Sequence, residues 1–136
     1  MRGDKYFYRW LCLQETLAEY MAKEKEENYL DALLQRLRQS ERGHVAIYKD
    51  AGMDRRYFSK LVSGQLKLPS KKAMIRLGLA MHLDLEGMQR LLHSCGYHLS
   101  ASVDLDLVVM YCISQGKYDL WQVNAMLYEL DLPLLE

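Results

Sequence analysis

Proline and cysteine are scarce in this chain, and long hydrophobic runs are missing. Only two of its 136 residues are proline, and no Pro/Gly-rich tract marks a linker between domains. The cysteines Cys12, Cys95 and Cys112 are widely spaced and form no CxxC pair, which argues against a disulfide scaffold. No apolar run approaches the roughly 20 residues that cross a bilayer, and the first ten residues hold no apolar signal core. These absences predict a cytoplasmic protein without a membrane span.

Sustained alternation of polar and apolar residues is also absent, so no strand is predicted. Apolar residues recur with a helical period almost throughout, which predicts an all-α chain. The expected helices run from Asp4 to Glu27 and then over 29–40, 44–51, 55–63, 71–83, 85–95, 103–114 and 120–130. Short polar residues in front of these segments are the helix N-caps that we expect, because their side chains accept from the free N–H groups of a first turn: Asn28, Asp54, Ser70, Asp84, Ser102 and Asp119.

The formal net charge is zero, but the charges are unevenly distributed. Residues 41–76 hold nine Lys and Arg against three Asp and Glu, whereas residues 77–136 hold two against eight. A basic block of this kind predicts an anionic partner for the middle of the chain, and the acidic remainder is expected to face away from it. The alternative is that these cations form an ordinary solvated surface.

The two short helices expected on either side of Gly52 have the layout of a helix-turn-helix. Glycine supplies the positive φ of the turn, Met53 can fill the angle between the helices, and Asp54 caps the second one. Within that second helix three apolar residues share an inward face (Phe58, Leu61 and Val62). Four polar residues lie mainly on its other faces: Arg55, Arg56, Ser59 and Lys60.

Residues 28–96 resemble the five-helix DNA-binding domain of the Cro/lambda-repressor type, also called Xre-like. The matching features are "AGMD" at the turn, Phe58 and Leu61 as inward hydrophobes, Gly64 after the second helix, and "LPS" before the next. Residues 97–136, with "GYHLS", "DLVV" and "GKYD", resemble the tail of a small bacterial subgroup of such proteins. The resemblance implies a five-helix core over 28–96, an N-terminal helix over 1–27 for packing or dimerisation, and a two-helix extension over 97–136.

The resemblance also implies a role for particular side chains. Arg55, Arg56, Ser59 and Lys60 would face base edges in the major groove of double-stranded DNA, and His44 would take the place of a phosphate-contacting residue. From their charge, and for the last two from their place at a helix N-terminus, Lys67, Lys71 and Lys72 are further candidates for phosphate contacts. Two residues depart from the family pattern: Tyr48 stands where a small alanine is usual, and Val62 replaces a polar residue.

Metal binding and catalysis find little support in the sequence. His93, Cys95 and His98 lie close together, but no second pair of ligands at zinc spacing follows. Asp104 and Asp106 are two residues apart and therefore on different faces of a helix, and no Gly-rich phosphate loop occurs. We therefore predict neither an enzyme nor a bound metal or cofactor.

The first expected helix carries an apolar stripe that has two interpretations. It packs against the tail helices of the same chain, or it forms the seam of a homodimer; its members are Tyr6, Phe7, Trp10, Leu13, Leu17 and Tyr20. The sequence thus predicts a bacterial or phage DNA-binding regulator of transcription that acts as a homodimer. The alternative is an adaptor or inhibitor that uses Tyr48, Tyr57 and Phe58 to bind a protein partner.

Overall fold

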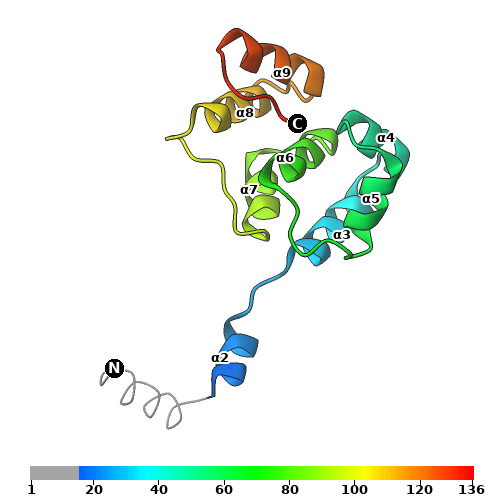
Figure 1. Cartoon of the computed structure of the whole chain (residues 1–136), viewed down its shortest axis with the longest axis vertical. Helices are drawn as coiled ribbons and strands as arrows, with labels where there is room; N and C mark the ends of the chain where they lie inside the picture. Colours follow the sequence, from blue (N-terminus) through cyan, green and yellow to red (C-terminus); the bar gives the residue numbers. More distant parts are fainter. Residues whose placement is uncertain (1–15) are drawn as a thin grey trace.

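The computed structural model describes residues 16–136, and every regular element in that range is an α-helix (Figure 1). The all-α prediction is therefore confirmed for the described chain. Along the sequence the helices are α2 (Leu17–Glu24), α3 (Tyr29–Gln39), α4 (His44–Asp50), α5 (Arg55–Val62), α6 (Lys71–Ala80), α7 (Leu85–His93), α8 (Asp104–Ser114) and α9 (Leu120–Glu129). Among these described helices, none is long and apolar enough to cross a membrane.

Five of the predicted N-caps are confirmed by their hydrogen bonds. The side chains of Asn28, Asp54, Ser70, Asp84 and Asp119 each accept from a backbone N–H in the first turn of α3, α5, α6, α7 and α9. The prediction for Ser102 is wrong. Ser102 lies in a turn, where its N–H donates to Ser100 Oγ at 3.1 Å. Val103 is therefore the extended residue before α8, and its side chain makes no capping hydrogen bond.

The prediction of one continuous helix from Asp4 to Glu27 is wrong for residues 16–27, the part of that range that the structure describes. Thr16 is extended and starts a new helix through a capping box, in which its hydroxyl accepts from Glu19 N while the Glu19 carboxylate accepts from Thr16 N. The helix ends at Glu24, and Lys25 is again extended. The aromatic residues Tyr6, Phe7 and Trp10, and also Leu13, lie outside the described residues.

Helix α2 stands apart from the other helices in Figure 1, at the end of a non-helical segment. None of its residues is buried, and its apolar side chains Leu17 and Tyr20 are 65% and 49% exposed. The interpretation that this stripe packs on the tail helices is therefore wrong for these two residues. In the segment that leads to α3, Glu26 Oε2 makes a hydrogen bond with His93 Nε2 at 2.6 Å.

The core is built around α6, which packs against α4, α7 and α9. Seven of its ten residues are buried, as expected for a helix that is apolar almost all round. The stripes of the neighbouring helices close over it, and the fully buried large side chains include Leu33, Ile47, Leu61, Met74, Ile75, Leu77, Met88, Leu92 and Leu127. The positions of α4 and α5 are therefore determined by one shared core.

The turn between α4 and α5 has the conformation that the sequence predicts. Gly52 has φ +67°, and the neighbouring Ala51 and Met53 are buried. Arg76 of α6 reaches this turn, and its Nη1 donates to the carbonyl oxygens of Ala51 and Gly52, both at 3.3 Å. The guanidinium of Arg76 thus secures the turn from inside and does not belong to the outer basic surface.

The tail helices α8 and α9 are attached to the rest of the chain by both polar and apolar contacts. Asp106 of α8 is only 1% exposed, and its Oδ2 lies 2.7 Å from Lys71 Nζ and 2.9 Å from Ser100 N. Asp106, in the acidic part of the chain that is expected to face away from an anionic partner, is therefore buried and paired with a cation of the basic block. After α9 the chain turns back, and Leu135 is fully buried near the C-terminus, where its N–H donates to Asn124 Oδ1 at 2.8 Å.

Leu120 of α9 also touches the α4–α5 turn, which gives a testable consequence. A Cβ added at Gly52 would lie 3.1 Å from Leu120 Cδ2, whereas one at Gly116, which has a similar φ of +68°, would meet nothing within 4 Å. We expect Gly116→Ala to lower the free energy of unfolding by about 1 kcal/mol through backbone strain alone. Gly52→Ala is expected to cost about 2 kcal/mol, because Leu120 must also move. Urea unfolding measures both, and equal losses would contradict the contact.

Candidate nucleic-acid interface

Helix α5 presents all four predicted base-contacting residues to solvent. Arg55, Arg56, Ser59 and Lys60 are exposed, while Phe58 and Leu61 on the opposite face are buried. The side chains of these four residues make no hydrogen bond or ion pair with any residue of the range 16–136. Asp54 Oδ1 accepts from Tyr57 N at 2.7 Å and so fixes the start of the helix beside both arginines. The structure therefore brings together four polar groups that are available to a ligand.

Helix α4 packs beside α5 through aromatic side chains. The Tyr48 ring is half-buried with its centroid 5.4 Å from that of Phe58, and the exposed His44 ring meets the edge of Phe58 at 5.7 Å. The Tyr48 ring packs on the Phe58 ring with the two planes inclined by 36°, and α4 and α5 remain in contact. Val62, expected on the inward face, is only half-buried.

The loop between α5 and α6 carries Lys67 and is held at two points. Tyr29 Oη donates to Leu66 O at 2.6 Å, and Tyr97 Oη donates to Pro69 O at 2.8 Å. Burial raises the pKa of Tyr29 above its ordinary value, so its hydroxyl keeps the proton that it donates. Lys67 itself is exposed at the surface of a positioned loop.

The two lysines that begin α6 differ in their surroundings. Lys72 is half-buried and forms no ion pair within residues 16–136. Lys71, predicted as a phosphate contact, places its ammonium on the buried Asp106 carboxylate at 2.7 Å. Its charge is therefore already neutralised inside the protein, and Lys67 and Lys72 are the better placed candidates.

The side chains of His93, Cys95 and His98, which are close together in the sequence, do not converge on one point. His93 contacts Glu26, Cys95 is buried, and His98 is exposed. Over residues 16–136 no three His, Cys, Asp or Glu side chains form a group able to hold a metal ion.

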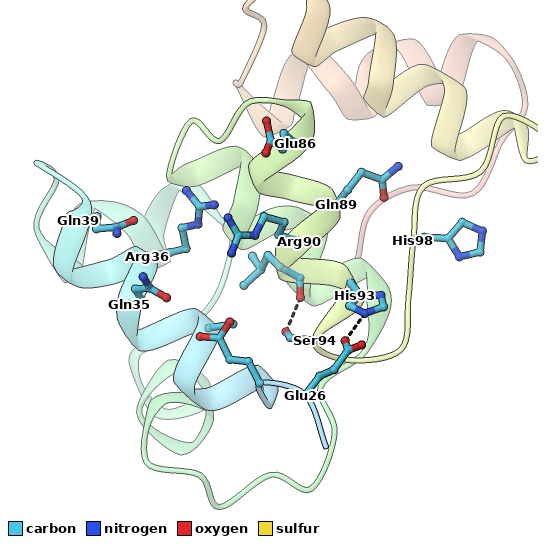
Figure 2. Close-up of a pocket in the computed structure, with 13 residues that line it drawn as sticks. Glu26, Gln35, Arg36, Gln39, Glu86, Gln89, Arg90, His93, Ser94 and His98 are labelled. Atoms are coloured by element: carbon cyan, nitrogen blue, oxygen red, sulfur yellow. Dashed lines mark hydrogen bonds and ion pairs between the residues drawn. The ribbon is translucent and has the colours of Figure 1, made fainter. Parts of the chain in front are cut away.

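His93 and His98 instead line a groove of about 740 Å³ between α3 and α7 (Figure 2). Figure 2 shows the guanidinium groups of Arg36 and Arg90 extending from the two helices toward each other. Gly87 of α7 lies beside the Arg36 guanidinium, since a Cβ built there would be in ordinary contact with both terminal nitrogens of Arg36, at 3.4 Å. Three carboxylates line the same groove, those of Glu26, Glu27 and Glu86, so its charge has no single sign. Sequence reasoning did not single out this groove, because it forms only where two polar helix faces meet.

The buried cysteines give a prediction about thiol reactivity. Burial raises the pKa of both the Cys95 and the Cys112 thiols, which lowers the fraction of reactive thiolate at a given pH. In a Cys12→Ser variant we expect both thiols to react with an aromatic disulfide reagent about a hundredfold more slowly at pH 8 than in denaturant, because reaction requires local opening. Absorbance of the released thiolate follows the reaction, and fast modification of the folded protein would contradict this expectation.

Comparisons with known proteins identify no relative of this chain. No protein-family model, no curated protein and no solved structure matches the chain. The candidate interface therefore depends on the residues described above.

Proposed function

We propose that this chain is a double-stranded DNA-binding regulator of the Cro/lambda-repressor type, in which α4 and α5 form a helix-turn-helix and α5 enters the major groove. One observation carries the proposal. Arg55, Arg56, Ser59 and Lys60 project from a single short helix, exposed and without partners among residues 16–136. A helix that is anchored by buried residues and displays free cations near its N-terminus has the properties of a recognition helix.

In this proposal the side chains divide into readers and phosphate contacts. Arg55 and Arg56 lie nearest the helix N-terminus, where a guanidinium can donate two hydrogen bonds to guanine. Ser59 and Lys60 extend the same surface. His44, Lys67 and Lys72 contact phosphates, whereas Lys71 would have to leave Asp106 before it could contribute.

The proposal also covers the oligomeric state and the cellular location of the protein. A repressor-type protein binds paired half-sites about 34 Å apart as a homodimer, so two copies of the chain are expected on one duplex. The exposed Leu17 and Tyr20 of α2 are apolar surface that a second copy can cover. A bacterial or phage cytoplasm is the proposed location.

The alternative function is a protein-interaction adaptor or inhibitor on the same scaffold. The half-buried rings of Tyr48 and Tyr57 favour it, because aromatic side chains at a surface are common anchors for protein partners. Phe58 is 4% exposed and belongs to the core, so it is not available for such a contact.

A salt titration of binding to random duplex DNA tests the proposed function. On random DNA, where no base is read, Lys60 also contacts a phosphate. With three ammonium groups on phosphates, those of Lys60, Lys67 and Lys72, the log of the binding constant should fall against the log of the salt concentration with a slope of about −2 to −3. Replacing Lys67 and Lys72 by glutamine should make that slope shallower by about 2. Lys23→Gln/Lys25→Gln, at the end of α2 and just after it, removes the same charge elsewhere and should leave the slope unchanged. The absence of measurable binding at low salt would exclude the DNA-binding function and favour the adaptor.

A further inference from the structure

A second groove, of about 940 Å³, lies where the α4–α5 turn meets the tail. One side comes from the end of α4 and the turn, with Lys49 and Gly52, and another from His82 in the corner after α6. The remaining side comes from the segment that leads into α9, with Lys117, Tyr118 and Trp121. The volume is in the range of small-molecule sites, which are typically about 300–1,000 Å³.

The wall around His82 is held in place by several contacts. The His82 ring stacks on the Tyr118 ring with centroids 4.8 Å apart and planes inclined by 16°. Arg42 Nη1 donates to Ala80 O at 3.1 Å and also lies 3.0 Å from His82 Nε2. His82 has φ +55°, a left-handed backbone conformation that residues other than glycine seldom adopt. This wall is therefore formed before any ligand arrives.

Trp121 supplies an exposed aromatic face to the groove. Its side chain is 78% exposed, although it lies in the first turn of a helix whose backbone is fixed by the bond from Trp121 N to Asp119 Oδ1 at 2.8 Å. The neighbouring Leu120 turns inward toward Gly52. The backbone of Trp121 is fixed and its indole is uncovered, so the indole presents a flat apolar surface on which a planar ring can stack.

The charged side chains that line the groove sum to +1, from Arg42, Lys49 and Lys117 against Asp50 and Asp119. Arg42 is paired with Asp50, and the Asp119 carboxylate accepts from the backbone of α9. Lys49 and Lys117 form no ion pair within residues 16–136, and Lys117 Nζ lies 5.9 Å from the centroid of the Tyr111 ring. An anionic group is the complement of these two ammonium groups.

We propose that this groove is a binding site for a small planar aromatic anion. The ring of the ligand stacks on Trp121, and its carboxylate or phosphate is held by Lys49 and Lys117. The site needs neither DNA nor the function proposed for α5.

The test uses the full chain with Trp10→Phe, because Trp121 is then the only tryptophan and gives a single indole N–H signal in a nitrogen-15 NMR spectrum. Titration with 2-naphthoate, or with adenosine 5′-monophosphate, is expected to shift that signal to saturation. The neutral counterparts, 2-naphthalenemethanol and adenosine, are expected to bind about tenfold more weakly or not at all, because they lack the charge-assisted contacts.

Calorimetry on variants then assigns the contacts. Lys49→Gln/Lys117→Gln should weaken binding of whichever anion binds by about tenfold or more, and Trp121→Ala should abolish it. The Lys23→Gln/Lys25→Gln variant, which removes equal charge at the end of α2 and just after it, should bind the anion as the parent does. Failure of both anions to bind, equal binding of the neutral counterparts, or insensitivity to the two groove lysines would each overturn the proposal. Because no DNA is present, these outcomes are independent of those that test α5.

Discussion

Replacing Arg55 and Arg56 together by glutamine is expected to weaken binding to a preferred duplex by about a hundredfold or more. Each guanidinium that donates two hydrogen bonds to guanine contributes about 1–3 kcal/mol of discrimination, so loss of both exceeds the effect of a charge change alone. The preferred duplex is first selected from a random pool, and fluorescence anisotropy then compares it with random DNA. Both arginines are exposed, so the free energy of unfolding should change little.

Two control variants separate base reading from general attraction. Lys23→Gln/Lys25→Gln removes the same charge at the end of α2 and just after it, and should leave the affinity for the selected duplex nearly unchanged. Arg55→Lys/Arg56→Lys keeps the charge but removes the planar fork, so binding to random DNA should persist while preference for the selected duplex falls. If the glutamine variant binds the selected duplex as tightly as the parent does, α5 does not read the bases.

The second large effect is expected from the ion pair between Lys71 and Asp106. Lys71→Met should lower the free energy of unfolding by about 3–5 kcal/mol, because it leaves a buried carboxylate without its partner. Asp106 is 1% exposed and retains only the Ser100 N–H as a donor after the change. Chemical denaturation of the full chain measures the loss.

Neighbouring positions provide the controls for this experiment. Lys72→Met makes the same replacement one residue along α6, where no ion pair forms among the described residues, and should cost within about 0.5 kcal/mol. The double variant Lys71→Met/Asp106→Leu should recover much of the loss, because an apolar pair can replace a buried ion pair at little net cost. A Lys71→Met variant as stable as the Lys72→Met variant would show that the pair contributes nothing to folding.

Local sequence patterns predicted most helix boundaries because those boundaries have local causes. Asn28, Asp54, Ser70, Asp84 and Asp119 bond to backbone groups within three residues, so the sequence alone identifies them. The capping box at Thr16 and Glu19 has an equally local signature, but the apolar period continues across it and favours one longer helix. Ser102 has the right residue type, but a turn from Ser100 delays the start of α8.

The roles of individual charges were harder to predict, since they depend on neighbours far away in the sequence. Lys71 and Asp106 are 35 residues apart, and nothing near either residue indicates that they meet. Arg76 looked like part of the basic surface but bonds to the turn at Ala51 and Gly52. The groove beside Trp121 likewise exists only because α9 lies against the α4–α5 turn.

The sequence by itself therefore determined the helical class, most helix starts, the left-handed Gly52 and the division of α5 into buried Phe58 and Leu61 and exposed Arg55 and Arg56. These features follow from period, capping chemistry and backbone sterics, which act over one or two turns of helix. Only the tertiary structure decided which cations remain free. That outcome depends on burial and on carboxylates brought from distant segments, because an ion pair forms wherever packing places two opposite charges within about 4 Å, whatever their separation along the chain.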